Sequence, residues 1–368
     1  MNKINWVLNS PTITSWMATV VNLGSSFVVL PLMMVKYNEN QISFWFLINT
    51  LLGFAALSDS GFGSTVTRAV TYFLSGASDI PKDINEYNKG FEVSDKPNIE
   101  KVVVLYGTTK IIYGYLSLLS FILLSTFGTL LVWNILSLSN HSIQMWFSFL
   151  MVIVYSVISI QTTRLSSILI GLGFVAKLNR LNILGGLLKM LLFVGFLLNS
   201  YPIVYLTGTI LNVGILVYFI NKYFINKWIN ENNVTILPDI FDKLIFKSLW
   251  PSTWKMGLIL WGGFFVNNGT SIVISQIKDV KIMASFLFTQ RVFNIIRGIS
   301  QAPYYSHLPE IINVVARKDF NEVKRIFSAY VFLSICLFVL ASLFVVFFGN
   351  YIIEILGIKT EFLPVHLI

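Results

Sequence analysis

The sequence predicts an all-α protein that crosses a membrane many times, and three observations lead to this fold class. The chain of 368 residues is 55% hydrophobic and only 12% charged. Its mean hydropathy is +0.73, and its apolar residues gather in runs of roughly 20, the length that a helix needs to cross the hydrocarbon core. A soluble domain carries roughly 25% charged residues, so too little polar surface is present to cover the apolar side chains. A soluble enzyme and a disordered chain are therefore excluded.

Nine complete apolar runs follow one another along the chain. They cover residues 13–35, 42–57, 103–133, 143–171, 181–198, 203–220, 254–277, 282–305 and 328–348. The first run is too long for a signal peptide, so we expect it to remain as a membrane helix. Residues 351–368 are expected to form a loop and part of a tenth span.

A polar stretch at 221–246 divides the predicted helices into two bundle halves. We expect an N-terminal six-helix bundle at 1–222, a cytoplasmic linker at 223–250 and an incomplete C-terminal bundle at 251–368. The loops on the outer side are all short. They leave no room for a catalytic domain outside the membrane.

Basic residues predict the orientation of the chain. With the N-terminus in the cytoplasm, the inner segments hold about fifteen Lys and Arg, whereas the outer segments hold Lys36, Lys278, Lys281 and Lys359. Inner loops carry this excess in membrane proteins, so we expect a multi-pass membrane protein with a cytoplasmic N-terminus. Most of the formal charge of +9 then sets orientation, and the expected partners include membrane lipids but no nucleic acid.

Ionisable side chains within spans are costly and are therefore candidates for function. By the predicted boundaries they are Lys110, Arg164, Lys189, Lys255, Arg291 and Arg297, with Asp59 and Arg68 around the inner end of the second span. Asp59 is the only acid, and such a set suits an anionic ligand better than Na⁺ or a cationic drug. Lys110, Arg164 and Lys255 lie near the inner surface, where their long stems can also snorkel to the headgroups.

A polar stripe on the eighth span is the most informative pattern. Gln290, Asn294, Arg297 and Gln301 recur at helical spacing, and Arg291 lies beside them. A continuous stripe of this kind faces protein or water rather than lipid. An interhelical hydrogen-bond seam is the alternative, but two guanidinium groups favour a substrate path.

The seventh span contributes Asn267 and Asn268, whose amides either bind sugar hydroxyls or pack helices together. Catalytic and metal-binding motifs are absent from the sequence. Three histidines fall in or near three different loops, and Cys336 is the only cysteine. The sequence therefore predicts neither an enzyme nor a metal or cofactor.

Three stretches carry a family resemblance. Residues 57–68 (LSDSGFGSTVTR) are similar to the Asp-x-Gly-(small)-Gly…Arg segment of polysaccharide flippases. Residues 288–297 (FTQRVFNIIR) resemble the corresponding helix, and 308–311 with 317–325 resemble the cytoplasmic linker before the ninth helix. Together they resemble the lipid-linked oligosaccharide flippases, most of all the O-antigen type, of the multidrug, oligosaccharidyl-lipid and polysaccharide exporter superfamily.

The resemblance implies a transporter with a cationic cavity between two helical bundles. Alternating access would carry undecaprenyl-diphosphate-linked repeat units of O-antigen or capsule across the inner membrane, with a polysaccharide polymerase and chain-length machinery as partners. Members of this family usually have more helices, so the chain is expected to be short at its C-terminus. The predicted substrate-binding residues are Arg291, Arg297, Asn294, Gln290, Gln301, Lys189, Lys255, Arg68, Asn267 and Asn268. A cation-coupled multidrug exporter of the same superfamily and a polytopic glycan-modifying enzyme are the alternatives.

Overall fold

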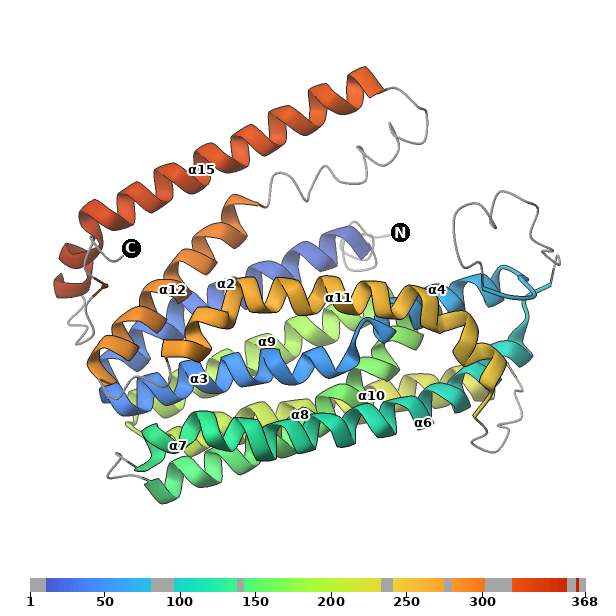
Figure 1. The fold of residues 1–368 in the computed structure, drawn as a ribbon, viewed down its shortest axis with the longest axis horizontal. Coiled ribbons are helices and arrows are strands. Elements are labelled where there is room, and N and C mark those ends of the chain that lie inside the picture. The colour runs from blue at the N-terminus through green and yellow to red at the C-terminus, as the bar shows by residue number, and fades with distance from the viewer. Residues whose placement is uncertain are drawn as a thin grey trace, which may run out of the picture. The chain divides into compact units, whose positions relative to one another are not determined.

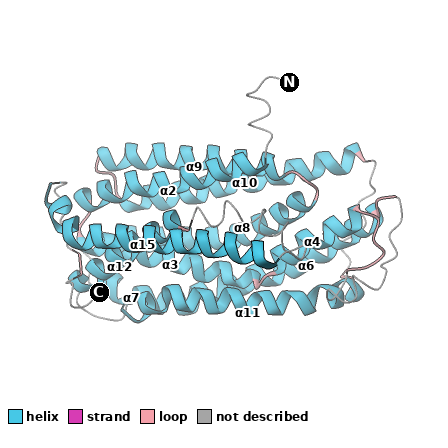
Figure 2. Cartoon of the chain, turned by 90° about the horizontal axis from the view of Figure 1, so that it is seen from above, coloured by secondary structure: helices cyan, strands magenta, loops and turns pink. Residues whose placement is uncertain are grey.

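The structure is a computed structural model that describes residues 11–80, 96–137, 142–232, 241–274, 280–301, 320–355 and 362–363. Its elements in these ranges are all helices, which confirms the all-α fold class (Figures 1 and 2). The α-helices are α2 (Pro11–Lys36), α3 (Glu39–Ala56), α4 (Phe62–Leu74), α6 (Ile99–Leu123), α7 (Thr129–Ser137), α8 (Ser142–Gly171), α9 (Val175–Leu198), α10 (Ile203–Glu231), α11 (Lys243–Ile274), α12 (Val280–Ser300) and α15 (Phe320–Ile355). A 3₁₀ turn, η1 (Leu57–Asp59), follows α3, and a π turn, η2 (Leu124–Gly128), joins α6 to α7.

Seven helical segments within the described ranges are long and apolar enough to cross a membrane. They are Glu39–Asp59, Ile99–Trp133, Ile143–Gly171, Val175–Leu198, Ile203–Glu231, Lys243–Ile274 and Lys324–Ile355. This supports the prediction of a membrane protein built from helices. The count of nine complete spans and part of a tenth stays a prediction.

The helices group into two compact units. Unit 1 comprises the described residues of Met1–Leu32 and Leu47–Gln276, and unit 2 comprises those of Met33–Phe46 and Ile277–Ile368. In unit 1, α8 packs against α10, α6 and α4, and Figure 1 shows α6, α8 and α10 side by side. Helix α11 packs against α4, η1 and α6 and belongs to unit 1. Most of its residues lie after the predicted linker, in the range predicted to form the C-terminal bundle. In unit 2, α12 packs against α15.

Helix α10 continues from the predicted end of the sixth span at residue 220 to Glu231. Asn221, Ile225 and Ile229 are buried at a spacing of four, so the packed face of the helix extends beyond its most apolar part. Asn221 Nδ2 also donates to Ser166 Oγ on α8 at 3.0 Å. Other polar residues that suggested a loop, Lys222, Asn226 and Lys227, lie on the exposed face of this helix.

Two further helix ends differ from the predictions. Helix α11 begins at Lys243, within the predicted polar stretch, because Asp242 Oδ1 accepts hydrogen bonds from the backbone N–H groups of Leu244 at 2.7 Å and Ile245 at 3.1 Å. Helix α15 continues through Ile355, so the prediction of a loop from residue 351 is wrong. Its final apolar residues extend the helix without a breaker.

Helix α4 is an element that the hydropathy pattern did not predict. Its apolar residues Val66, Ala69, Val70 and Phe73 are buried at helical spacing, and they join a core that includes side chains of α6, α8 and α10. The sequence of α4 is rich in threonine, a weak helix former. Thr65, Thr67 and Thr71 bond back to backbone carbonyls four residues earlier, so their hydroxyls are satisfied within the helix.

Candidate functional site

The predicted stripe on α12 becomes less covered by protein toward the C-terminal end of the helix. Gln290 and Asn294 are half-buried, whereas Arg297 and the following Gln301 are exposed, and so is Arg291. Met283 and Leu287 precede the stripe at the same helical spacing and are buried, so this face of α12 is packed at its start and becomes exposed only toward its end.

A cavity of about 380 Å³ lies in unit 2 between the end of α12 and the first half of α15. It falls within the range of roughly 300–1,000 Å³ that is typical of sites for small molecules. Two of the four predicted stripe residues, Arg297 and Gln301, line this cavity. Gln290, Asn294 and Arg291 are not among the residues that line it.

Two polar lining residues were not predicted from the sequence. They are Ser300 on α12, which is only 3% exposed, and Ser334 on α15. The Oγ of Ser334 is buried and has no hydrogen-bond partner in the structure. No carboxylate occurs among the described residues that line the cavity, so its only formal charge there is the guanidinium of Arg297.

The predicted cationic residues of unit 1 lie on three different helices. Lys189 is half-buried on α9, whereas Lys255 on α11 and Arg68 on α4 are exposed. None of the three forms a hydrogen bond or an ion pair with a described residue of unit 1, so the structure does not join them into one site there.

The two predicted asparagines of α11 bond within their own helix. Asn267 Nδ2 donates to the carbonyl oxygen of Gly263 at 2.5 Å, and Asn268 Nδ2 donates to that of Phe264 at 3.3 Å. Both side chains are half-buried. These contacts engage amide donors that were candidates for sugar hydroxyls.

Asp59, the single acid of the predicted spans, is held by neighbouring groups in unit 1. Its Oδ1 accepts a hydrogen bond from Tyr113 Oη at 2.5 Å, and its Oδ2 accepts one from the backbone N–H of Gly63 at 3.0 Å. A carboxylate at the N-terminal end of α4 also interacts favourably with the helix dipole. Asp59 therefore joins α6 to the start of α4.

The glycine-containing pattern of residues 57–68 has a structural explanation in the turn between α3 and α4. Ser60 and Gly61 both adopt left-handed backbone conformations, with φ of 47° and 82°. A Cβ on Gly61 would lie 2.6 Å from Met256 Cβ, so only glycine allows α11 to pack this closely. A Cβ on Gly63 would likewise lie 3.0 Å from Ser167 Oγ of α8. The pattern thus serves helix packing at this position.

Arg164 differs from what its sequence position suggests. The sequence places it near the inner surface, where snorkelling is possible, but it is only 4% exposed. Its guanidinium carbon lies 5.1 Å from the centre of the Tyr106 ring, and its Nε and Nη1 have no hydrogen-bond partner. The cation–π contact with Tyr106 partly offsets the cost of burying this charge. Lys110, by contrast, is exposed.

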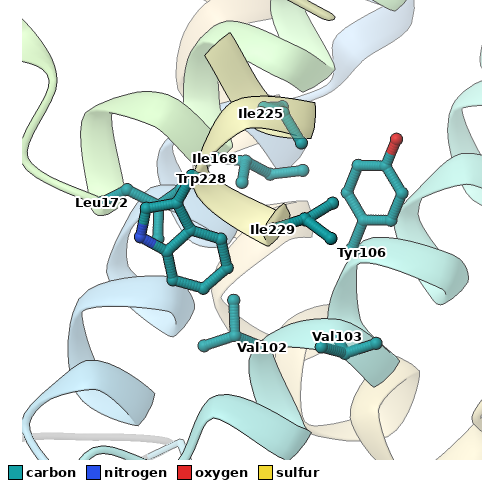
Figure 3. Close-up of a pocket in the computed structure, with 8 residues that line it drawn as sticks. All are labelled: Val102, Val103, Tyr106, Ile168, Leu172, Ile225, Trp228 and Ile229. Atoms are coloured by element: carbon teal, nitrogen blue, oxygen red, sulfur yellow. The ribbon is translucent and has the colours of Figure 1, made fainter. Parts of the chain in front are cut away.

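A small pocket in unit 1 lies where α6, α8 and α10 meet (Figure 3). The rings of Trp228 and Tyr106 lie on either side of Ile229 in this view. Its volume is about 20 Å³, enough for a single water, but a buried water requires polar partners and this lining is apolar. We regard it as a packing gap rather than a ligand site.

Comparisons of the chain with protein-family models, with curated proteins and with solved structures find no match. The function therefore has to be argued from the sequence and the geometry above.

Proposed function

We propose that the protein is a flippase that moves undecaprenyl-diphosphate-linked oligosaccharide repeat units of O-antigen or capsule across the bacterial inner membrane. The observation that carries this proposal is the cavity beside Arg297 and Gln301, which has no carboxylate among its described lining residues. A guanidinium matches the geometry of phosphate oxygens, and a nearby carboxylate would repel them. The family resemblance in residues 57–68 and 288–297 supports the same proposal.

The bonding of Asp59 favours an anionic cargo over a cationic drug. A drug exporter needs a carboxylate that can turn to the transported cation. Both carboxylate oxygens of Asp59 already accept hydrogen bonds, from Tyr113 and from Gly63. Releasing them would leave a buried phenol and a helix N–H without partners, which costs about 1–3 kcal/mol per group.

The proposed protein works in the inner membrane with its N-terminus in the cytoplasm. Its cargo is assembled on the cytoplasmic side, so the inner ends of the helices are where binding begins. A polysaccharide polymerase and chain-length machinery would act on the cargo after transport. The protein itself changes no covalent bond in the cargo.

Complementation tests this function. A bacterium that lacks its own flippase should regain surface polysaccharide when it expresses this chain. Arg297→Ala should reduce the rescue, because a hydrogen bond to a charged group contributes roughly 1.5–3 kcal/mol, or about 10- to 100-fold in binding. Arg325→Ala is the matched control. Arg325 is exposed, forms an ion pair with Glu322 at 2.6 Å, and is not among the residues that line the cavity.

Three outcomes would contradict the proposal. One is export of cationic dyes that continues when polysaccharide synthesis is blocked, which identifies a drug exporter. Another is a covalent change in the lipid-linked sugar on incubation with purified protein, which identifies an enzyme. The third is full rescue by Arg297→Ala at normal protein levels, which removes the cationic cavity from the mechanism.

A further inference from the structure

Two residues that follow α15 in the chain contact α12 in unit 2. Phe362 and Leu363 lie outside any helix and are half-buried. The ring of Phe362 stacks on that of Phe288 of α12, with 4.9 Å between the ring centroids and 30° between the ring planes. The backbone N–H of Leu363 donates to Thr289 Oγ1, also on α12, at 2.9 Å. One ring pair and one hydrogen bond therefore attach these residues to α12.

Helix α15 meets the same ring through a glycine. A Cβ on Gly349 would lie 2.6 Å from Cε2 of Phe362, so a side chain there would have to displace the ring. Gly349 is buried, although the preceding Phe348 is 54% exposed. Glycine lowers helix stability relative to alanine, and the close approach of the ring explains why α15 carries one at this position. Phe362 thus contacts both helices.

This contact and the cavity lie in opposite halves of the same helix pair. Phe288 precedes the cavity residue Arg297 by nine residues, or about 14 Å along α12. Gly349 follows the cavity residue Phe338 by eleven residues, or about 16 Å along α15. The two helices are therefore joined through Phe362 in one half and separated by a space of about 380 Å³ in the other.

The contact is of a kind that can open and close. A ring pair and a hydrogen bond between uncharged groups each change an equilibrium by about tenfold or less. Release leaves the hydroxyl of Thr289 satisfied, because Thr289 Oγ1 also donates to the carbonyl oxygen of Ser285 at 2.8 Å. Only the backbone N–H of Leu363 then needs a new partner. The contact can hold one arrangement of the helices without preventing another.

Helix α15 is free to change its angle to α12. Among the described apolar side chains of α15, only Ile326 at 8% and Ile353 at 6% exposure are buried. A helix with so few buried side chains can pivot at little cost in core packing. A purely structural clamp is the alternative reading of the Phe362 contact, and it would stay closed throughout transport.

We infer that Phe362 and Leu363 form a latch, which joins α12 to α15 in the half of the pair away from the cavity, and that this latch opens during transport. When the latch is closed, the helices stand apart at the cavity. When it opens, α15 pivots, so that the latched halves part and the halves around the cavity close. This inference rests on the proposed function, since a transporter has to close one end of its path as it opens the other.

Locking the latch with a disulfide tests whether it opens. Thr289→Cys and Leu363→Cys place two thiols across the hydrogen bond, and Cys336→Ser removes the native cysteine. Oxidation should join the two cysteines, because backbones this close meet the geometry of a disulfide. In a cell whose surface polysaccharide depends on this chain, the oxidised protein should stop exporting polysaccharide. A reductant should restore export.

The matched controls are Thr289→Cys alone and Leu363→Cys alone, each combined with Cys336→Ser. Neither can form the cross-link within one chain, so both should export equally before and after oxidation. Full export by the cross-linked protein would overturn the inference, because the latch then stays closed during transport. Absence of a cross-link would also overturn it, because the two residues are then not neighbours.

Distances between two spin labels on the purified protein in lipid nanodiscs measure the latch without any transport. The labels replace Ile282 of α12 and Tyr351 of α15, which are 47% and 65% exposed, in the Cys336→Ser background. Phe362→Ala should broaden the distribution of distances between the labels, because the helices are no longer joined. Phe347→Ala, at a position of α15 that is 75% exposed, is the control and should leave the distribution unchanged.

Equal distributions in the two alanine variants would overturn the latch. Failure of the proposed function gives a different result. A protein whose label distances respond to Phe362→Ala, but which never restores surface polysaccharide, would keep the latch and lose the flippase. Rescue by the cross-linked protein would keep the flippase and remove the opening of the latch from its mechanism.

Discussion

The two units differ in how they place polar groups. At the turn between α3 and α4 in unit 1, the carboxylate of Asp59 is bonded to Tyr113 and to Gly63 at 2.5 and 3.0 Å. In unit 2, Arg297 and Gln301 line a cavity, and the hydroxyl of Ser334 remains without a partner. Groups that satisfy one another stabilise a fold, whereas groups that line an open space can serve a ligand.

This contrast shows that a charged residue in a membrane span can serve the fold rather than the function. An intramembrane ionisable residue is a candidate site by default, and both Asp59 and Arg297 meet that description. Their surroundings differ, because Asp59 is hydrogen-bonded to protein groups whereas Arg297 lines a cavity. The following predictions test whether the division holds, and they begin with the change of largest expected effect.

Asp59→Ala should lower the free energy of unfolding by about 3 kcal/mol. The variant removes a group that caps the start of α4, which contributes roughly 0.5–2 kcal/mol, and leaves the buried Tyr113 hydroxyl unpaired, which costs roughly 1–3 kcal/mol. Thermal or denaturant unfolding of the protein in detergent measures the change. Arg297→Ala, measured alongside, should lower stability less than Asp59→Ala does, because Arg297 is exposed.

Asp242→Ala provides a matched control for the cap. Asp242 bonds to the N–H groups of Leu244 and Ile245 at the start of α11, without a buried phenol. Its loss should cost about 1 kcal/mol. If the two aspartate variants are equally destabilised, the bond between Asp59 and Tyr113 adds nothing and the comparison of the two units fails on this side.

The architecture of the chain was more predictable from the sequence than the site. Runs of about 20 apolar residues identify membrane helices because lipid imposes a length and an apolar composition on each of them. The predicted run at 143–171 differs by one residue from α8, Ser142–Gly171. Helix α4 was missed because it is short, and polar residues separate its buried Val66, Ala69, Val70 and Phe73.

Within the site, helical spacing predicted which residues share a face of α12 but not what that face meets. Arg297 and Gln301 reach the cavity, while Arg291 and Asn294 do not line it. Ser334 could not be found in advance, since a serine in an apolar helix is common and only the packing of α15 on α12 brings it to the cavity. The burial of Arg164 depended in the same way on contacts distant in the sequence.

Gly171→Ala should destabilise unit 1 by about 2 kcal/mol. A Cβ at this position would lie 2.6 Å from Val70 Cβ and 2.8 Å from the carbonyl oxygen of Thr67, so α4 and α8 would have to separate. The bond from Thr67 Oγ1 to the Ser167 carbonyl, 3.0 Å long, would lengthen with them. Unfolding in detergent measures the loss.

Gly195→Ala is the control for this change, because a Cβ there meets nothing within 4 Å. In the interior of α9 the substitution should raise helix stability by up to about 1 kcal/mol. Equal effects of the two alanines would mean that α4 and α8 are not in close contact. Unit 1 would then lack the tight packing that distinguishes it from the cavity in unit 2.

Arg164→Met should have the smallest effect, a gain in stability of about 1 kcal/mol or no change. The Nε and Nη1 of Arg164 are buried without partners, and replacing a poorly compensated buried charge by an apolar side chain of similar length is often neutral or stabilising. The stabilising interaction that the variant loses is the cation–π contact with the ring of Tyr106, at 5.1 Å. Rescue of surface polysaccharide should be retained. Loss of transport at normal stability would instead give Arg164 a role with the anionic cargo, and a buried charge of unit 1 would then serve function.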